Sequence, residues 1–430
     1  MVIIHSTNRR RTHLSNNSEI PVAGNGLLNR RIFLKAGAVS SAALLINHAS
    51  AQTQSGWMNV PGAGLSESSA ASKYETELRR VAIGAETGTT GSGVSRSPLP
   101  YLDGIITPSR LHFERHHSGI PDIDPDKHEL IIHGLVDRPL KFSMDHLARY
   151  RTVSRIQFLE CAGNSLRLLY PEALQTTCSH IHGLVSASEW GGVPLSTLLD
   201  EVGVNPKGKW LVASGADSAK MSRSVPLEKI MDDAIVALYQ NGEPLRPANG
   251  YPLRLFLPGW EGNMSVKWLH TLKIVDQPAM TKDETSKYSD LLANGQTRLF
   301  SYPMEVKSVI TSPAPELVMK EKGVYQISGI AWSGRGKIKR VEISADGGNS
   351  WAEAALDEHV LPICLTRFRS AWRWNGGPAV IMSRATDMEG NIQPTRRVVL
   401  QGRAPNAFDH CNAIQAWQVN SNGKVNNVYA

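Results

Sequence analysis

The stretch Phe158-Leu-Glu-Cys-Ala-Gly-Asn-Ser165 starts like the end of a buried β-strand and then sets a cysteine against a turn. Its first residues continue the apolar run RIQFL, and Gly163-Asn164 is a turn signal. The chain has 430 residues but only four cysteines. The chemical role of Cys161 therefore decides how the sequence is interpreted.

Three interpretations of Cys161 compete on chemical grounds. A lone cysteine is usually a small buried core residue, which fits the strand but not the turn that follows. A nucleophile of the Cys-His hydrolase type would need a local signature, and none surrounds this residue. A thiolate ligand would suit a soft or thiophilic metal. The residues alone leave the core and metal-ligand interpretations open.

The N-terminal region has the organisation of an export signal. Asn29-Arg-Arg-Ile-Phe-Leu-Lys35 precedes a mildly apolar stretch, residues 36–46, and Ala49-Ser50-Ala51 suits a cleavage site. Paired arginines followed by Phe-Leu-Lys resemble a twin-arginine signal, which generally serves proteins exported already folded. A membrane-anchoring helix is the alternative, but the apolar stretch is short. We therefore expect residues 1–51 to lie outside the fold and the mature protein to be periplasmic, without a membrane anchor.

The charge balance argues against a nucleic-acid partner. The whole chain has a formal net charge of +7, but residues 1–51 contain six Lys/Arg and one acidic residue, which leaves +2 for the remainder. A basic surface that binds nucleic acid would require a larger excess. Any positive potential in the mature protein must therefore come from a local pocket.

The other cysteines, Cys178, Cys364 and Cys411, form no CxxC motif with Cys161, so zinc-ribbon and thioredoxin-type motifs are absent from the sequence. Export permits disulfides, but four cysteines over this length do not make a disulfide framework. A bond between Cys178 and Cys411 is left open.

Changes in composition and hydrophobic pattern along the chain predict more than one domain, as the length also requires. Residues 52–100 are rich in Ser, Gly, Ala and Thr and predict a linker or surface arm, with a short helix at Lys73–Ile83. Short apolar runs bounded by turn residues then alternate with helical candidates, which predicts a mixed α+β domain over residues 101–297. Its helical candidates are Ser143–Tyr150, Pro194–Val202 and Pro226–Met231, and Asn241-Gly242 is a hairpin turn.

Residues 298–405 read as an immunoglobulin-like β-sandwich. Strand-like runs recur at sandwich spacing. Val341, Ile343 and Ala345 alternate with polar residues, and the turn signal Asp346-Gly347-Gly348 follows. The remaining residues, 406–430, are polar and are expected to form a C-terminal tail.

The octamer around Cys161 resembles the motif with which the sulfite oxidase family of molybdenum enzymes supplies its one protein ligand to the metal. Further segments resemble that family in the same order, over roughly residues 101–400. They are ITPSRLHFERHHSGIPDIDPDKHEL, ASGADSAKMSRSVPLEKIMDDAIVALYQNGEPL, NGYPLRLFLPGWEGNMSVKWL, and SVITSPAP through GIAWSGRGKIKRVEISADGGNSW. The resemblance implies an α+β protein in which a mixed α/β molybdopterin-binding domain precedes an immunoglobulin-like dimerisation domain.

The resemblance also assigns residue roles. It implies that Cys161 binds molybdenum, whose other ligands are molybdopterin dithiolene sulfurs and oxo groups. Arg115 in FERHH and Tyr288 in TSKYSDLL match the family's active-site arginine and tyrosine, and are expected to be catalytic. The expected cofactor contacts are Arg115, His117, Cys161, Asp217, Asn249, Arg254, Ser265 and Lys267. Without the segment matches, the cations would be interpreted as solvated surface charges and Asp217 as a turn residue.

The sequence departs from the family's pattern at four positions. Asn249 stands where animal sulfite oxidases have a histidine, and Leu166 stands where the family's sulfite pocket has a second arginine. A pocket tryptophan falls near His180, and the C-terminal pocket arginine falls nearest to His410. A pocket with fewer cations is a poorer trap for a small dianion and suits a substrate carried on a protein arm.

The resemblance therefore implies a periplasmic oxidoreductase that transfers water-derived oxygen to reduced sulfur. The expected substrate is a persulfide on the cysteine of a sulfur-carrier protein, with free sulfite as the alternative. One molybdenum-molybdopterin per chain is expected. The sequence has no CxxCH haem motif, so a c-type cytochrome subunit is expected to accept the electrons. A homodimer through the sandwich is expected as well.

Overall fold

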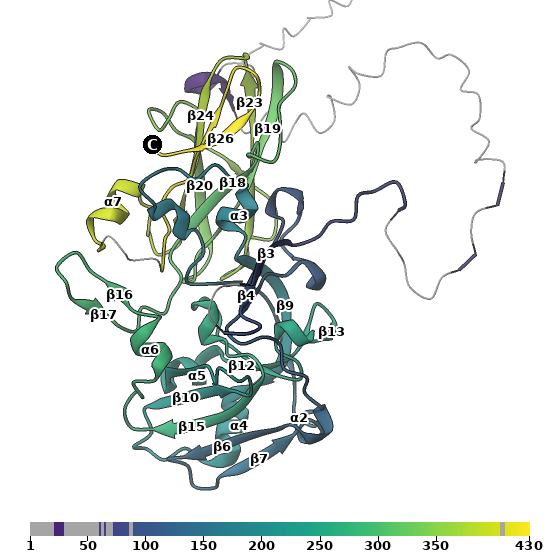
Figure 1. The fold of residues 1–430 in the computed structure, drawn as a ribbon, viewed down its shortest axis with the longest axis vertical. Helices are drawn as coiled ribbons and strands as arrows, with labels where there is room; N and C mark the ends of the chain where they lie inside the picture. The colour runs from purple at the N-terminus through teal and green to yellow at the C-terminus, as the bar shows by residue number, and fades with distance from the viewer. Residues whose placement is uncertain (1–20, 30–59, 62–63, 66–71, 86–88, 405–408) are drawn as a thin grey trace, which may run out of the picture.

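The computed structural model describes residues 21–29, 60–61, 64–65, 72–85, 89–404 and 409–430. It shows an α+β region, lower in Figure 1, joined to a β-sandwich above it. This architecture confirms the expected fold class. The arginine pair and apolar stretch of the expected export signal, residues 30–51, lie outside the described residues. None of the helices in the described ranges is both long and apolar enough to span a bilayer.

The α+β region contains two five-stranded sheets. The first sheet has the order β11-β10-β15-β6-β7, with a parallel pair between β15 and β6 and antiparallel pairs elsewhere. Its strands are β6 (Glu129–Gly134), β7 (Leu140–Ser143), β10 (Trp210–Gly215), β11 (Ser222–Pro226) and β15 (Leu269–Val275). The second sheet has the order β13-β12-β9-β8, with β14 added on β12. Its strands are β8 (Val153–Glu160), β9 (Val185–Pro194), β12 (Ile235–Gln240), β13 (Glu243–Pro244) and β14 (Arg254–Phe256).

Short helices connect these strands, and their positions follow the sequence signals. Ser143 caps its helix with a capping box, and Leu195 and Leu227 each follow a proline. The helices are α2 (Met144–Leu147), α3 (Cys178–His182), α4 (Leu195–Val202), α5 (Leu227–Asp233) and α6 (Lys282–Ser286). The hairpin at Asn241-Gly242 joins β12 to β13. The three predicted helices and this hairpin are therefore confirmed.

The sandwich consists of two facing sheets. One contains β18 (Lys307–Ser312), β19 (Gly323–Trp332), β22 (Ala355–Leu356) and β23 (Thr366–Trp374). The other contains β20 (Ile338–Ser344), β21 (Ala352–Glu353), β24 (Ala379–Asp387), β25 (Ala416–Val419) and β26 (Val425–Val428). The alternating residues Val341, Ile343 and Ala345 are fully buried between them, as predicted. A hairpin, β16 (Asp290–Leu291) and β17 (Thr297–Arg298), and helix α7 (Arg396–Gln401) flank the sandwich.

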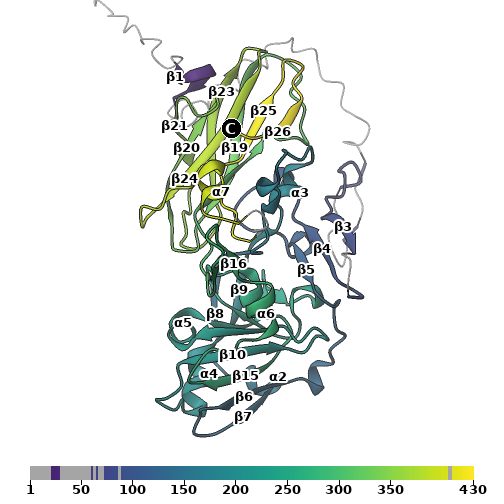
Figure 2. The same cartoon turned by 60° about the vertical axis from the view of Figure 1, so that its left-hand side comes forward.

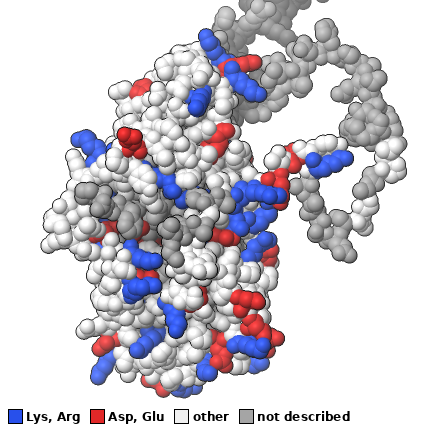
Figure 3. Space-filling model, viewed as in Figure 1, with Lys and Arg blue, Asp and Glu red and all other residues white. Residues whose placement is uncertain are grey.

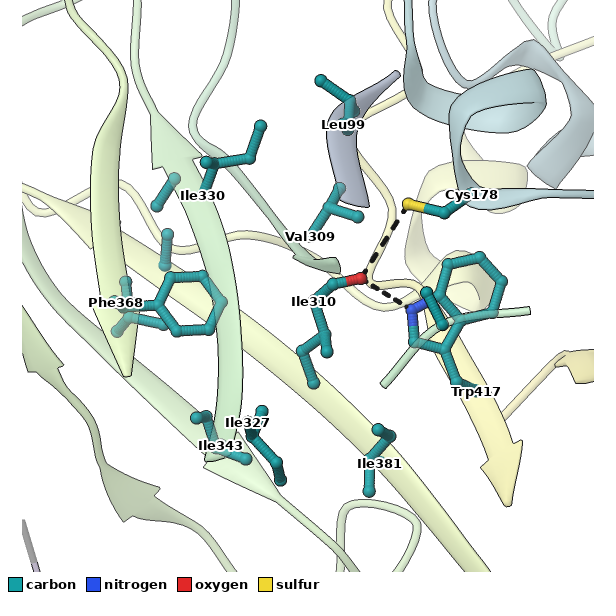
Figure 4. Packing of buried hydrophobic residues seen from close by; sticks show 14 of the residues in the cluster. Leu99, Cys178, Val309, Ile310, Ile327, Ile330, Ile343, Phe368, Ile381 and Trp417 are labelled. Carbon is teal, nitrogen blue, oxygen red and sulfur yellow. Dashed lines mark hydrogen bonds between the residues drawn. The ribbon is translucent and has the colours of Figure 1, made fainter. Parts of the chain in front are cut away.

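The core of the sandwich continues into the α+β region. Figure 4 shows Cys178 of α3 and Trp417 of β25 both directed at the carbonyl of Ile310 in β18. The Trp417 indole donates to this oxygen at 2.9 Å, and the Cys178 thiol lies 3.9 Å from it. All four cysteines are free thiols, so Cys178 and Cys411 form no disulfide.

Two segments differ from the sequence-based expectation. The predicted helix at Lys73–Ile83 is wrong, because residues 73–80 have no regular structure and the chain then enters β3 (Val81–Ala85), which pairs with β4 (Gly93–Arg96) and, through it, β5 (Glu114–His116). Pairing with distant strands overrides local helix propensity. The polar tail also differs from expectation, because β25 and β26 complete a sandwich sheet.

The expectation that the whole N-terminus lies outside the fold is wrong for one short segment. Residues 21–28 form β1 (Pro21–Ala23), the 3₁₀ turn Gly24–Gly26 and β2 (Leu27–Leu28) on the edge of the β23 sheet. Figures 1 and 2 both place this segment on the sandwich, far from the α+β sheets.

A buried ion pair ties the two regions together. Glu160, the last residue of β8, is fully buried and accepts from Lys307 Nζ at 2.6 Å. Lys307 is the first residue of sandwich strand β18. The carboxylate also accepts from Trp332 Nε1 at 2.6 Å and from Asn164 Nδ2 at 2.9 Å. A buried carboxylate with three donors is satisfied, whereas one without its cation is costly.

We therefore expect Lys307→Met to lower the free energy of unfolding by about 3 kcal/mol, because Glu160 is left buried without its counter-ion. Lys141→Met is the control, since it removes the exposed pair with Glu129, and such surface pairs contribute about 0–1 kcal/mol. Urea titration of both variants measures the difference. Equal shifts of the unfolding midpoint would show that the Glu160–Lys307 pair does not stabilise the junction.

Candidate active site

A single cavity collects the chemistry-bearing residues that the sequence singled out. It encloses about 700 Å³ of empty space, its opening to solvent included. Its walls come from β5, the end of β8, the loops before β14 and β15, and the segment after α6.

Cys161 lies in the wall of this cavity, at the end of β8. The strand stops here because the chain turns: Asn164 N donates to the Cys161 carbonyl at 2.9 Å, and Ser165 has a left-handed backbone with φ 67°. Asn164 fixes the turn from both sides, because its amide donates to Glu160 and its Oδ1 accepts from Leu184 N. The turn thus brings the thiol into the cavity wall, where it also packs against the core cluster that contains Leu159 and Phe113.

Close packing against a second loop holds the Cys161 backbone. A Cβ on Gly262 would lie 2.8 Å from the Glu160 carbonyl oxygen, so only glycine fits there. Burial raises the pKa of the Cys161 thiol to about 11, and the positive charge of Arg115 partly counteracts this. The free thiol is therefore protonated at neutral pH, and a bound metal cation would displace its proton.

Two buried cations lie deeper in the cavity. Arg254, on β14, donates to the carbonyls of Asn249 and Ser265 at 2.9 and 2.7 Å, and its Nε has no protein partner. Lys267 Nζ contacts the carbonyls of Arg115 and Ala248 and Nδ1 of His116. Burial lowers the pKa of Arg254 to about 9 and the pKa of Lys267 well below its usual value.

These cations lack enough negative charge around them. Arg254 and Lys267 line the cavity together with two carboxylates, and one of those, Glu114, is paired with Arg80. The other, Asp217, accepts from Ser118 Oγ at 3.3 Å. Buried cations that are only partly neutralised favour an anionic ligand such as a phosphate. The cavity therefore fits an anionic group better than a neutral one.

A hydrogen-bonded chain positions the tyrosine. Tyr288 Oη lies 3.0 Å from His117 Nε2, and Lys287 Nζ lies 3.4 Å from His117 Nδ1. Burial, followed by the charge of Arg115, lowers the pKa of His117 to about 3, so the ring is neutral. A lysine can only donate, so Nδ1 accepts and the ring proton resides on Nε2, which donates to Tyr288. The Tyr288 hydroxyl is then free to donate its own proton to another hydrogen-bond acceptor.

Beneath the tyrosine lies a buried arginine that the sequence did not single out. The Arg223 guanidinium stacks 4.7 Å from the Tyr288 ring centroid. Two buried carboxylates hold it, Glu284 at 2.9 Å and Glu261 at 3.2 Å. This cluster fixes the ring from behind, because a cation over an aromatic face is attracted by its π-electrons.

All of the residues expected at the site line the one cavity. They are Arg115, His117, Cys161, Asp217, Asn249, Arg254, Ser265, Lys267 and Tyr288. Their positions agree with the expected roles but do not test them. Ser265 also has a structural contact, because its hydroxyl accepts from Leu257 N at 3.0 Å. The positions that depart from the family pocket, Leu166, His180 and His410, are not among the lining residues.

Sequence reasoning missed several residues at the site. His112, His116 and Trp268 line the cavity, and Lys267 lies 4.3 Å from the Trp268 ring centroid. FERHH contains His116 beside two expected site residues, which was a usable signal. Asp409 was also missed: a Cβ on Gly163 would lie 3.8 Å from its Oδ1, and His410 N donates to the Ala162 carbonyl. No local pattern links residue 409 to the Cys161 turn.

The residues present fit a molybdenum cofactor. The described residues contain no group of three or more His, Cys, Asp or Glu that could hold a metal ion. A metal at Cys161 must therefore bring most of its ligands with it, as a metal in an organic cofactor does. One thiolate for the metal and buried cations for an anionic group are the donors such a cofactor requires.

Family models agree with this division of the chain. Residues 117–282 match the model of an oxidoreductase molybdopterin-binding domain, and residues 298–416 match that of a Mo-co oxidoreductase dimerisation domain. These two matches define the class: the chain is a molybdopterin-dependent oxidoreductase.

Known proteins place it more narrowly. The fold matches the crystal structure of the sulfane dehydrogenase SoxCD from Paracoccus pantotrophus with a TM-score of 0.81 and 41% identity, covering 85% of this chain and 96% of that one. Nitrate reductase [NADH] from Solanum lycopersicum is 32% identical over 71% of this chain, and nitrate reductase [NADH] 1 from Arabidopsis thaliana is 31% identical over 65%. This chain spans 38% and 34% of their respective lengths.

The chain belongs to the sulfite oxidase family of molybdenum enzymes. The likeness to SoxCD confirms that, within this family, the sequence resembles SoxC, the molybdenum subunit of the Sox sulfane dehydrogenase.

The raised pKa of Cys161 predicts how cofactor-free protein reacts with iodoacetamide. Only the thiolate reacts, so labelling of Cys161 should accelerate about tenfold per pH unit from pH 7 to 10 without levelling off. Mass spectrometry of the peptide containing Cys161 measures the rate. A plateau by about pH 9 would be typical of an unperturbed thiol and would contradict the burial effect. Protein loaded with molybdenum cofactor should resist labelling throughout.

Proposed function

We propose that this protein is a periplasmic molybdenum sulfane dehydrogenase. It oxidises the outer sulfur of a persulfide on a carrier protein's cysteine and passes the electrons to a c-type cytochrome. The observation that carries the proposal is the pairing of one cavity-facing thiol, Cys161, with Arg115 and Tyr288 on the walls of a cation-rich cavity. The similarity to a structure described as a sulfane dehydrogenase supports the same reading.

The cofactor and the chain divide the work. The molybdenum cofactor, when bound, supplies oxygen-atom transfer and accepts two electrons for each oxygen. Cys161 holds the metal, and Arg254 and Lys267 bind the phosphate of the pterin. Their lowered pKa values, caused chiefly by burial, return toward normal when an anion lies beside them. Asp217, Asn249, Ser265 and His117 contribute further contacts to the pterin.

Arg115 and Tyr288 act on the substrate. Arg115 lines the same cavity as Cys161, and its guanidinium donates to the His116 carbonyl. In this proposal its positive charge stabilises negative oxygens as they form on the substrate sulfur. Tyr288 accepts a hydrogen bond from His117 and keeps its own proton to donate into the cavity. The charge of Cys161 contributes to the raised pKa of Tyr288, mainly a burial effect, so the hydroxyl stays protonated over the physiological range.

The overall reaction follows from the balance of atoms, charge and electrons. A persulfide anion and three waters give a thiosulfonate, six protons and six electrons, two electrons for each oxygen transferred. No haem motif is present in the sequence, so the electrons leave to a separate c-type cytochrome subunit. The match to a dimerisation domain supports a homodimer through the sandwich.

The surroundings of Cys161 favour a carrier-bound substrate over free sulfite. A second arginine in the pocket would attract a small dianion, but the corresponding residue here is Leu166, outside the cavity lining. Asp409 brings a carboxyl group to the Cys161 turn instead. His410 is directed away, with Nε2 3.6 Å from Glu261. Asp409 adds no positive charge at the Cys161 turn, and burial raises its pKa to about 7. A protein carrier, by contrast, supplies binding energy from its own surface.

Cys161→Ser should leave the fold intact and lower turnover at least about 1,000-fold, because the metal loses its one protein ligand and the several kcal/mol that its chemistry contributes. Circular dichroism checks the fold, and elemental analysis and steady-state assays check metal content and rate. Cys364→Ala, in the sandwich, is the control and should keep its activity. A fully active Cys161→Ser protein would end the ligand assignment.

Substrate identity has its own test. Purified protein is mixed with oxidised c-type cytochrome and either sulfite or a persulfidated carrier protein. We expect fast cytochrome reduction with the persulfidated carrier and slow reduction with sulfite, because the pocket attracts small dianions poorly. Carrier without its persulfide sulfur is the control. Rapid reduction by sulfite alone would make the protein a sulfite dehydrogenase.

A further inference from the structure

The segment just before the paired arginines docks on the folded sandwich. Leu27 of β2 pairs with Trp372 of β23 in antiparallel register, and β1 folds back on β2. Leu27 is fully buried and joins the sandwich core, and Leu28 is nearly as buried. Leu27 therefore fills space that belongs to the sandwich core rather than lying loosely on its surface.

Polar contacts specify the turn between the two strands. The Trp372 indole donates to the Asn25 carbonyl at 2.8 Å. The Asn25 side chain donates to the carbonyl of Ala345 at 2.8 Å, and Gly24 N donates to Ser350 Oγ at 2.6 Å. The hydrogen-bond partners of this turn therefore come from both sheets of the sandwich. A strand that only pairs with the edge of one sheet would contact residues of that sheet alone.

Two glycines are required for this fit. A Cβ on Gly26 would lie 2.3 Å from the Arg373 carbonyl oxygen, and the residue has φ +87°. A Cβ on Gly24 would lie 2.1 Å from Asp346 Oδ2. Asn25 between them is left-handed, with φ 56°, a conformation that asparagine tolerates better than most residues. The sandwich thus accepts the sequence Gly-Asn-Gly-Leu-Leu and excludes bulkier versions of it.

The docked segment lies directly before the expected export signal in the sequence. Arg30-Arg31 and Phe33-Leu34-Lys35, the expected export signal, begin two residues after Leu28. Docking needs β23, Ala345 and Ser350 in their folded positions, and these residues lie more than 300 positions further along the chain. An unfolded or incomplete chain therefore cannot hold the segment.

We propose that the sandwich carries a peptide-binding site for the chain's own leader segment, Pro21–Leu28. The site takes a short extended peptide by β-strand addition, and its specificity comes from the core position filled by Leu27 and from a turn in which only glycine fits at positions 24 and 26. Binding is intramolecular and requires a folded sandwich. The docked segment therefore distinguishes the folded chain from the unfolded chain for any export component that recognises the adjacent arginine pair. This inference goes beyond the oxidoreductase function and depends neither on the cofactor nor on the substrate.

Hydrogen exchange of the full chain tests the docking directly. Backbone amides of residues 21–28 should exchange at least about tenfold more slowly than an unstructured peptide. Gly26→Ala should abolish this protection, because the added methyl group meets a backbone carbonyl. Gly64→Ala is the matched control, since a Cβ there has no atom within 4 Å, and it should exchange like the wild type. Both variants should keep wild-type turnover.

Adding the segment back provides a second arm. The synthetic peptide with the sequence of residues 21–28, added to the Gly26→Ala chain, should slow exchange at Trp372–Trp374, and the same peptide with alanine at the Gly26 position should not. Unprotected wild-type residues 21–28, or equal protection in Gly26→Ala, would overturn the proposal. Protection that disappears on dilution would assign the segment to a second copy and overturn the intramolecular site.

Discussion

The buried carboxylate of Glu160 is the contact on which the arrangement of the site depends. It ends the strand that leads to Cys161, and it is held by one residue of its own turn, Asn164, and by two sandwich residues, Lys307 and Trp332. Because a charge without water demands all of its donors, these groups have little freedom to move. The direction of the thiol is thus determined jointly by both halves of the molecule.

Electrostatics accounts for the rest of the cavity. Histidines at positions 112, 116 and 117 have strongly lowered pKa values, chiefly through burial, so they remain neutral among cations. The positive charge is thereby confined to arginine and lysine, deep where an anion is needed. Outside, Figure 3 shows basic and acidic side chains interspersed over the face in view. The cavity is thus lined by cations, whereas the face seen in Figure 3 shows no comparable excess of one sign.

Sequence patterns predicted what local chemistry determines. The alternation of Val341 and Ile343 and the helix that starts at Ser143 were readable, because each signal lies within a few residues. Arg115 and Cys161 were assigned to a site only through the family resemblance of their segments. Partners far apart along the chain were not readable. Asp409 reaches the Cys161 turn across more than two hundred residues, and Lys73–Ile83 lost its predicted helix to a strand pairing. Neither outcome is visible as a periodic pattern in the sequence, because both depend on contacts with residues that are distant along the chain.

The place of Lys307 at the head of the sandwich has an evolutionary consequence. Since this module supplies the counter-ion for a carboxylate next to the Cys161 turn, it cannot be exchanged for an unrelated domain without disturbing the α+β region. Gene fusions that join other domains to this protein would have to retain the α+β region and the sandwich together. Recombination should therefore add or remove partners at the ends of this pair and leave the boundary between the halves uncut.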